Sequence, residues 1–172
     1  MRLTVFNPKR VKLFAITLVA TTFAIAGCAK GFNTAAASDA ALIEQAAASS
    51  TLTVFRSPTC GCCSKWIDHM EAAGFKVEDN VTEDMDAVKQ QYGVPATMTS
   101  CHTTVANGYA IEGHIPAADV ARLLVEKPDV AGIAVPGMPI GSPGMESGDY
   151  TEPYTVFSFS EDGTTTTFSN HS

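Results

Sequence analysis

The sequence predicts a single α/β domain over residues 51–172, with the element order βαβαββα followed by a loop and a terminal β-hairpin. Three observations predict this fold class. Segments rich in β-branched and aromatic residues alternate with segments whose apolar residues recur every three or four positions. Glycine or proline stands at the ends of these segments. A length of about 120 residues suits one domain with one core.

The first strand and the first helix carry a cysteine cluster between them. Residues 51–56 are rich in β-branched and aromatic side chains and predict a strand. Ser57 and Pro58 are typical of a helix start, and Gly74 is typical of a helix end. Apolar residues at helical spacing predict an amphipathic helix over 60–73, and they are Cys63, Trp66, Ile67 and Met70.

The second strand and the second helix follow directly. A strand is predicted to begin at 75–77. Residues 82–92 predict a helix, because acidic residues stand in its first turn, where the helix dipole favours negative charge. Gly93 ends this helix.

A hairpin and a third helix complete the predicted core. Asn107-Gly108 is the dipeptide most typical of a tight hairpin turn, and it separates the predicted strands 102–105 and 109–112. Residues 116–126 then predict a helix with one apolar face, made by Val120, Leu123 and Leu124.

The C-terminal part is predicted to be a loop and a hairpin. Residues 135–145 contain glycine and proline at a density that excludes helix and regular strand, and they include Met138 and Met145. Residues 154–160 and 165–169 predict a hairpin that adds to a sheet edge.

The element order and the position of the cysteines resemble the thioredoxin fold. In that fold a Cys-x-x-Cys pair begins the helix after the first strand, as Cys60 and Cys63 do here. The segment before the third strand usually holds a cis-proline that receives an extended peptide. Here that segment is 98–102, and it offers the thiol of Cys101 and the imidazole of His102 instead.

The spacing of Cys60 and Cys63 puts both sulfurs on one face of a helix start. First-turn amides and the helix dipole stabilise thiolate there, and a thiolate serves either disulfide exchange or a soft metal. The pair also fits a local structural disulfide. For Cys62 three roles remain open: a third ligand, a small buried apolar residue, or a resolving thiol.

Cys101 and His102 favour a metal site. Together with the Cys-x-x-Cys they form a shell of thiolates and imidazole, which selects Cu(I) or Zn(II) over Mg²⁺ or Ca²⁺. Thioether is a soft ligand that suits copper, so Met138 and Met145 are accessory candidates, with loop packing as the alternative. The metal candidates are therefore Cys60, Cys62, Cys63, Cys101, His102, Met138 and Met145.

The other histidines are assigned structural places. His114 is expected to be a capping or hydrogen-bonded residue. His69 is expected on the polar side of the first helix, and His171 in the C-terminal tail.

The N-terminus predicts export and lipid anchoring. Residues 1–27 combine a basic start with a 15-residue uncharged run, which is signal-peptide length and short for a membrane span. The run ends in Ile-Ala-Gly-Cys, which resembles the bacterial lipobox and makes Cys28 the lipidated residue. The alternatives are a secretory signal cut near 35–37 and a retained membrane anchor. Residues 28–50 predict a flexible tether.

The charge of the chain excludes one class of partner. After removal of residues 1–27, seven basic and eighteen acidic residues remain, a net charge of −11. Nucleic-acid binding needs basic surface, so no nucleic-acid partner is expected.

Four motifs together resemble a known bacterial family. They are Ser-Pro-Thr-Cys-Gly-Cys-Cys-Ser-Lys-Trp at 57–66, Ser-Cys-His-Thr at 100–103, Ile-Glu-Gly-His-Ile-Pro at 111–116 and Val-Pro-Gly-Met-Pro-Ile-Gly-Ser-Pro-Gly-Met-Glu at 135–146. The family is a domain of unknown function labelled metal-binding, or CopG-like after copper-resistance clusters. The resemblance spans about 52–169. It implies a thioredoxin-like envelope protein that handles copper or another heavy metal, with ligands at Cys60, Cys63, Cys101 and His102.

These observations predict a periplasm-facing, lipid-anchored protein that binds Cu(I) without turnover, as a buffer or chaperone in copper homeostasis or resistance. Its expected partners are the metal ion, the membrane, and a copper exporter, oxidase or other copper protein. The main alternative is a thiol–disulfide oxidoreductase in which Cys60 attacks and Cys63 resolves. A metal-redox role, a structural zinc site and an adhesion module are further alternatives.

Overall fold

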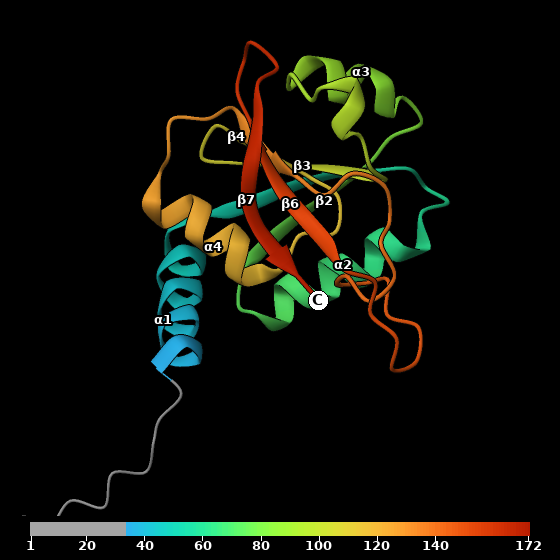
Figure 1. Cartoon of the computed structure of the whole chain (residues 1–172). Coiled ribbons are helices and arrows are strands. Elements are labelled where there is room, and N and C mark those ends of the chain that lie inside the picture. Colours follow the sequence, from blue (N-terminus) through green and yellow to red (C-terminus); the bar gives the residue numbers. More distant parts are fainter. Residues whose placement is uncertain (1–33) are drawn as a thin grey trace, which may run out of the picture. The chain divides into compact units, whose positions relative to one another are not determined.

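The computed structural model describes residues 34–172 (Figure 1). The predicted signal peptide, 1–27, and the predicted lipidation site, Cys28, lie outside this range. Among the described residues, no helix is long and apolar enough to cross a membrane.

The described chain alternates helices and strands around one sheet. Its helices are α1 (Thr34–Ser49), α2 (Gly61–Ala72), α3 (Met85–Gln91) and α4 (Ala117–Glu126), with a 3-10 turn at Ala96–Met98. Its strands are β1 (Thr51–Arg56), β2 (Lys76–Val81), β3 (His102–Ala106), β4 (Tyr109–Glu112), β5 (Gly132–Ala134), β6 (Tyr154–Phe159) and β7 (Thr165–His171). From β1 to α4 the order is the predicted βαβαββα, so the α/β class is confirmed.

Two predicted boundaries differ from the structure. The strand predicted to start at 75–77 continues to Val81, because all six residues of β2 pair with β1. The helix predicted over 82–92 begins only at Met85, since the carboxylate of Asp84 accepts a hydrogen bond from Ala87 N at 3.0 Å and caps it.

The strands form one seven-stranded mixed sheet in the order β2-β1-β3-β4-β5-β6-β7. β1 pairs with β2 in parallel and with β3 in antiparallel, and β3 and β4 form the predicted hairpin. β5 was not predicted, because its three residues carry no periodic signal. Gly132 allows β5 to pair there, since a Cβ would meet the carbonyl of Ala110. The C-terminal hairpin β6–β7 extends the sheet at one edge, as predicted.

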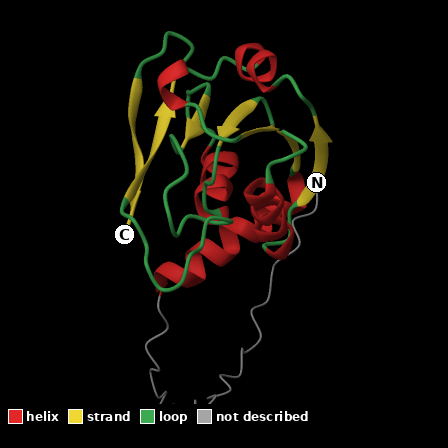
Figure 2. Cartoon of the chain, turned by 90° about the vertical axis from the view of Figure 1, so that its right-hand side faces the viewer, coloured by secondary structure: helices red, strands yellow, loops and turns green. Residues whose placement is uncertain are grey.

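The two faces of the sheet have separate cores. Figure 2 shows the longer helices together on one side of the strands and α3 on the other. On the first side the buried residues of the strands pack against α1, α2 and α4, with Trp66, Met70 and Leu123 fully buried. On the α3 side a smaller apolar cluster surrounds Phe159, and Phe55 contacts Tyr92 with 5.6 Å between ring centroids.

The flexible tether predicted over 28–50 is wrong for its described part. Residues 34–49 form α1, which runs beside α4 (Figure 1). Ala46 is fully buried in the main core, and Leu42 and Ile43 pack against the same cluster. The alanine-rich composition suggested a tether, but alanine is also the best helix former, and small side chains allow close helix packing.

His171, predicted as tail, belongs to β7. Its Nε2 lies 2.6 Å from Asp119 Oδ2, and its ring stacks on Tyr154 at 4.9 Å. Ser169 Oγ lies 3.1 Å from the same Nε2 and donates to the same Asp119 oxygen at 2.7 Å. These contacts join β7 to α4. They do not form a nucleophilic triad, because in a triad the serine and the aspartate contact different ring nitrogens of the histidine.

Replacing Ala46 with aspartate tests whether α1 is part of the domain. A carboxylate at this fully buried position has no partner to pair with, so we expect the free energy of unfolding to fall by about 3 kcal/mol. The exposed Ala41→Asp is the matched control in the same helix. Equal denaturation midpoints for the two variants would show that α1 does not contribute to the folded core.

Candidate metal centre

The N-terminus of α2 holds three of the four described cysteines. Cys60 occupies the N-cap position, and its backbone N–H donates to Ser57 O at 3.1 Å. Cys60 and Cys63 form a disulfide, with their Cα atoms 5.4 Å apart. Cys63 faces the core and is fully buried. In this state the Cys-x-x-Cys pair carries no thiol, and Cys62 and Cys101 are the free cysteines among the described residues.

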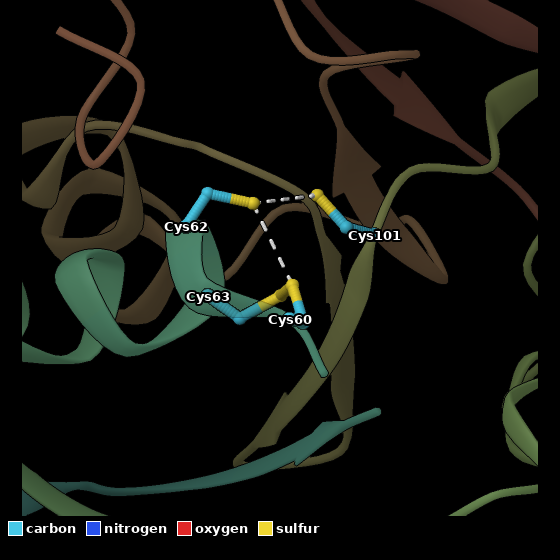
Figure 3. A group of neighbouring side chains, drawn as sticks. All are labelled: Cys60, Cys62, Cys63 and Cys101. Carbon is cyan, nitrogen blue, oxygen red and sulfur yellow. Dashed lines mark hydrogen bonds between the residues drawn. A yellow bond between two sulfur atoms is a disulfide. The ribbon is translucent and has the colours of Figure 1, made fainter. Parts of the chain in front are cut away.

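Cys62 connects the disulfide to Cys101. Its Sγ lies 3.5 Å from Cys60 Sγ and 3.7 Å from Cys101 Sγ (Figure 3). All four sulfur atoms lie within 4.8 Å of one another. Cys62 therefore points toward the other sulfurs. This is possible because Cys60, at the N-cap, lies outside the regular helix, which begins at Gly61.

The segment before β3 brings Cys101 to this group. The backbone N–H of Ser100 donates to Glu112 Oε1 at 2.6 Å, and the hydroxyl of Ser100 donates to the carbonyl of Gly137. Gly137 N in turn donates to Thr99 O at 3.2 Å. These bonds connect the segment to β4 on one side and to the loop of residues 135–145, the Gly/Pro/Met loop, on the other.

His114 extends the sulfur group with a ring nitrogen. Its Nε2 lies 3.0 Å from Cys101 Sγ, and its Nδ1 lies 2.7 Å from the carbonyl of Pro143. A carbonyl only accepts, so Nδ1 carries the proton and Nε2 presents a lone pair to the sulfur. Burial lowers the pKa of His114, which favours this neutral form.

His102 lies behind Cys101 and is fully buried. Its ring stands 4.5 Å from that of Trp66 and 5.1 Å from that of His114. Neither ring nitrogen has a hydrogen-bond partner among the described residues. Burial, followed by the charges of His114 and Lys89, lowers the pKa of His102 well below its usual value. A buried imidazole without a partner is uncommon, and a metal ion would satisfy it.

The thiol of Cys101 is held in its protonated form. Burial, and next the charge of Cys62, raises the pKa of Cys101 to about 12. A thiolate there therefore requires a cation to replace the proton. Metal binding supplies such a cation and releases the proton.

The two methionines differ in their relation to the site. Met145 lines a cavity of about 530 Å³ together with Cys62, Gly144 and Ile140, so it shares this cavity with one of the four cysteines. Met138 is 53% exposed and is not among the residues lining this cavity. The loop between them is hydrogen-bonded, for example from Met145 N to Ser142 O at 2.8 Å, and Pro143 and Gly144 are buried.

The structure gathers some predicted residues and adds another. Two overlapping groups have metal-ligand spacing: Cys60, Cys62, Cys63 and Cys101, and Cys101, His102 and His114. His69 lies outside both groups, and its Nε2 accepts a hydrogen bond from Ala117 N at 3.3 Å.

His114 was expected to be hydrogen-bonded, and it is, but its contact with Cys101 was not predicted. The signal that could have found it is the preceding glycine. Gly113 has φ +82°, and a Cβ there would meet Ser100 Oγ, so the chain must turn toward the Cys101 segment at this point.

The donor set fits a soft, thiophilic metal. Reduction of the Cys60–Cys63 disulfide by two electrons and two protons would give four thiols beside two neutral imidazoles. Thiolate and imidazole ligands suit Cu(I) and Zn(II). The unpaired nitrogens of His102, and the lone pair that His114 Nε2 presents to Cys101, add possible ligands at the inner side of the group.

Solved structures decide the family. One, titled copper resistance protein CopG, form 2, is 49% identical, with a TM-score of 0.69 over 72% of this chain and 98% of that chain. The chain belongs to the CopG-like copper-resistance family. Form 1 of CopG is 50% identical, with a TM-score of 0.68 over 70% of this chain and 96% of that chain.

Other comparisons are consistent with CopG-like membership. A family described as a protein of unknown function, DUF411, matches residues 98–145, which include Cys101, His114 and both loop methionines. No curated protein matches. The CopG-like relatives and the Cys/His cluster together support a copper-related metal-binding role.

A substitution at Gly144 tests whether the Gly/Pro/Met loop orients the His114 ring in this CopG-like site. The φ of Gly144 is +82°, and a Cβ would lie 2.8 Å from both Cys62 O and Trp66 N. We expect Gly144→Ala to displace Pro143, break its hydrogen bond with His114 and cost about 2 kcal/mol of stability. Nitrogen NMR of the His114 ring, which reports the tautomer, checks the hydrogen bond.

The matched control is Gly148→Ala. Gly148 also has a positive φ, +62°, but a Cβ there meets nothing within 4 Å. The control carries the backbone strain without the steric clash. If both variants leave the His114 tautomer unchanged, the loop does not orient this ring.

Proposed function

We propose that this chain binds Cu(I) in the cell envelope and acts as a copper buffer or chaperone. The observation that carries the proposal is the convergence of four cysteine sulfurs within 4.8 Å, beside two buried histidines that share Cys101. Cu(I) accepts two or three soft ligands, so this set offers more sulfur than one ion requires. The copper-resistance names of the relatives support the same metal.

The partial exposure of the group suits exchange of the metal. Cys62 and Cys101 are half-buried, whereas Cys63 and His102 are fully buried. Cys62 and Met145 line the same surface cavity, so an incoming ligand from a partner protein would meet sulfur at the mouth of the site. A copper exporter, an oxidase or another copper protein is the kind of partner that such exchange would serve.

We also infer that the fold is thioredoxin-like. The sheet order β2-β1-β3-β4, with β1 parallel to β2 and antiparallel to β3, supports this assignment. The Cys-x-x-Cys at the start of the helix after β1 supports it as well. One feature disfavours the binding of an extended peptide substrate. The backbone N–H of Ser100, next to Cys101, already donates to the Glu112 carboxylate and is not available to a peptide.

A thiol–disulfide oxidoreductase is the second candidate function, and the Cys60–Cys63 disulfide favours it. In that reaction one thiolate of a substrate dithiol would attack Cys60 Sγ and release Cys63 as thiolate, and the second substrate thiol would then resolve the mixed disulfide and release Cys60 as thiolate. However, Cys62 Sγ lies 3.5 Å from Cys60 Sγ, and Cys101 Sγ lies 3.7 Å from Cys62 Sγ. A substrate that approached the disulfide from this side would meet these two thiols first.

An anaerobic Cu(I) titration of the reduced protein against a competing chelator tests the first function. We expect Cys101→Ser to weaken Cu(I) binding at least about 10-fold, because Cys101 belongs to both ligand groups. His69→Ala, outside both groups, is expected to leave it unchanged. Trp66 is the single tryptophan and lies against His102, so its fluorescence reports occupancy.

Three results would reverse this assignment. Equal affinities of the two variants would exclude Cys101 as a ligand. Tight Zn(II) binding without Cu(I) binding would indicate a structural zinc site. Rapid oxidation of a dithiol substrate that depends on Cys60 would favour the oxidoreductase.

The lipid anchor on Cys28 remains part of the proposal. It is supported by the lipobox-like Ile-Ala-Gly-Cys sequence at 25–28. We expect Cys28→Ala to move the protein from the membrane fraction to the soluble fraction and to abolish labelling by a radioactive fatty acid. Cys62→Ala, with the same loss of a thiol, is the control. Continued fatty-acid labelling of Cys28→Ala would exclude this anchor.

A further inference from the structure

The geometry points to Glu112 as the residue that positions Cys101 for metal binding, an inference that rests on the proposed Cu(I) function. Glu112 is not a ligand: it lies in neither of the two groups with metal-ligand spacing. It is the last residue of β4, and its side chain is fully buried on the α3 side of the sheet.

Three donors from three segments converge on this carboxylate. Ser100 N donates to Oε1 at 2.6 Å, and Thr103 Oγ1 donates to Oε2 at 2.6 Å. Lys89 of α3 donates to Oε1 at 2.5 Å and forms a buried ion pair with it. Charge-assisted hydrogen bonds of this kind are about twice as strong as neutral ones.

Two of these donors flank Cys101 and His102. Ser100 precedes them, and Thr103 follows them, so the carboxylate clamps the backbone on both sides of the pair. The clamp holds Cys101 Sγ where it is 3.7 Å from Cys62 Sγ and 3.0 Å from His114 Nε2. Metal–sulfur bonds tolerate only about 0.2 Å of deviation, so the position of this sulfur decides whether it can join the other ligands.

The backbone of Glu112 links the same site to His114. Gly113 N donates to His102 O at 3.0 Å, and Val135 N donates to Glu112 O at 3.0 Å. Only Gly113 separates Glu112 from His114. Glu112 therefore holds the segment of Cys101 and His102 through its side chain and the segment of His114 through its backbone.

Charge and position predict opposite effects when Glu112 is replaced. Glu112→Gln removes a negative charge and leaves the Lys89 cation without its ion pair, which would favour nearby thiolates and tighten Cu(I) binding if charge were decisive. Loss of position predicts weaker binding instead.

The test compares Cu(I) affinity in two backgrounds. In the otherwise unchanged protein, Glu112→Gln is expected to weaken Cu(I) binding by about 10- to 100-fold, as outer-shell substitutions do. In the Cys101→Ser background the same substitution is expected to change affinity by less than about 2-fold, because its effect passes through Cys101. Glu126→Gln, at an exposed site on α4, is the control.

An affinity loss of equal size in both backgrounds would overturn the proposal, since it would show a general effect on the fold. Unchanged or tighter binding in the otherwise unchanged protein would overturn it as well.

A second readout uses the reduced, metal-free protein. Alkylation of Cys101, followed by peptide mass spectrometry, is expected to accelerate on the order of 10-fold in Glu112→Gln, while alkylation of Cys62 stays constant. If the unaltered protein binds no Cu(I), the proposed function fails, but this measurement still decides the positioning role. Loss of the Glu112 charge would by itself favour the Cys101 thiolate, so Thr103→Val is measured as well, because it removes one of the three donors without a change of charge. It must accelerate Cys101 alkylation in the same direction, whether or not Glu112→Gln folds. An unchanged rate would refute the role.

Discussion

The antiparallel pairing of β1 with β3 is the constraint on which the site depends. Arg56, the last residue of β1, pairs with His102, the first residue of β3. The chain therefore leaves β1 and enters β3 at the same end of the sheet. The N-terminus of α2 and the segment containing Cys101 must meet there, although 39 positions separate Cys62 from Cys101. A shift of this register by one residue would turn His102 to the opposite face and move Cys101 away from the helix.

The remaining parts of the site are arranged around this junction. The β3–β4 hairpin returns the chain so that Glu112 lies opposite Thr103 and His114 follows beside Cys101. The Gly/Pro/Met loop then covers the start of α2. There a Cβ on Gly144 would clash with Cys62 O and Trp66 N. The disulfide between Cys60 and Cys63 and a metal bound by their thiolates are mutually exclusive states of the same atoms. Binding of a metal by the full set would consequently be coupled to the redox state of this pair.

Local signals in the sequence were sufficient for most of the core. Helical periodicity located α2 and α4, and Asn107-Gly108 located the β3–β4 hairpin, because these features depend on neighbours in the chain. The three-residue β5 and the packing of α1 on α4 depend on distant contacts and leave no periodic trace. The dependence on distant contacts also explains why two histidine contacts were not predicted. The contact of His114 with Cys101 and that of His171 with Asp119 arise from tertiary packing, whereas the cysteine spacing at 60–63 is visible directly in the sequence.

The hydrogen bond between His114 and Pro143 has a consequence for how the protein matures. The Cys60–Cys63 bond spans three positions, so it can form as soon as that turn meets an oxidant, before the rest of the domain has folded. Cys101 joins only after β3 pairs with β1, and the ring of His114 is oriented only when residue 143 has arrived, 29 positions later. A partly synthesised or partly folded chain thus exposes sulfur without the complete set of ligands. An assembly that proceeds from this local turn to the distant loop would let the cysteines oxidise before the complete set of metal ligands is in place.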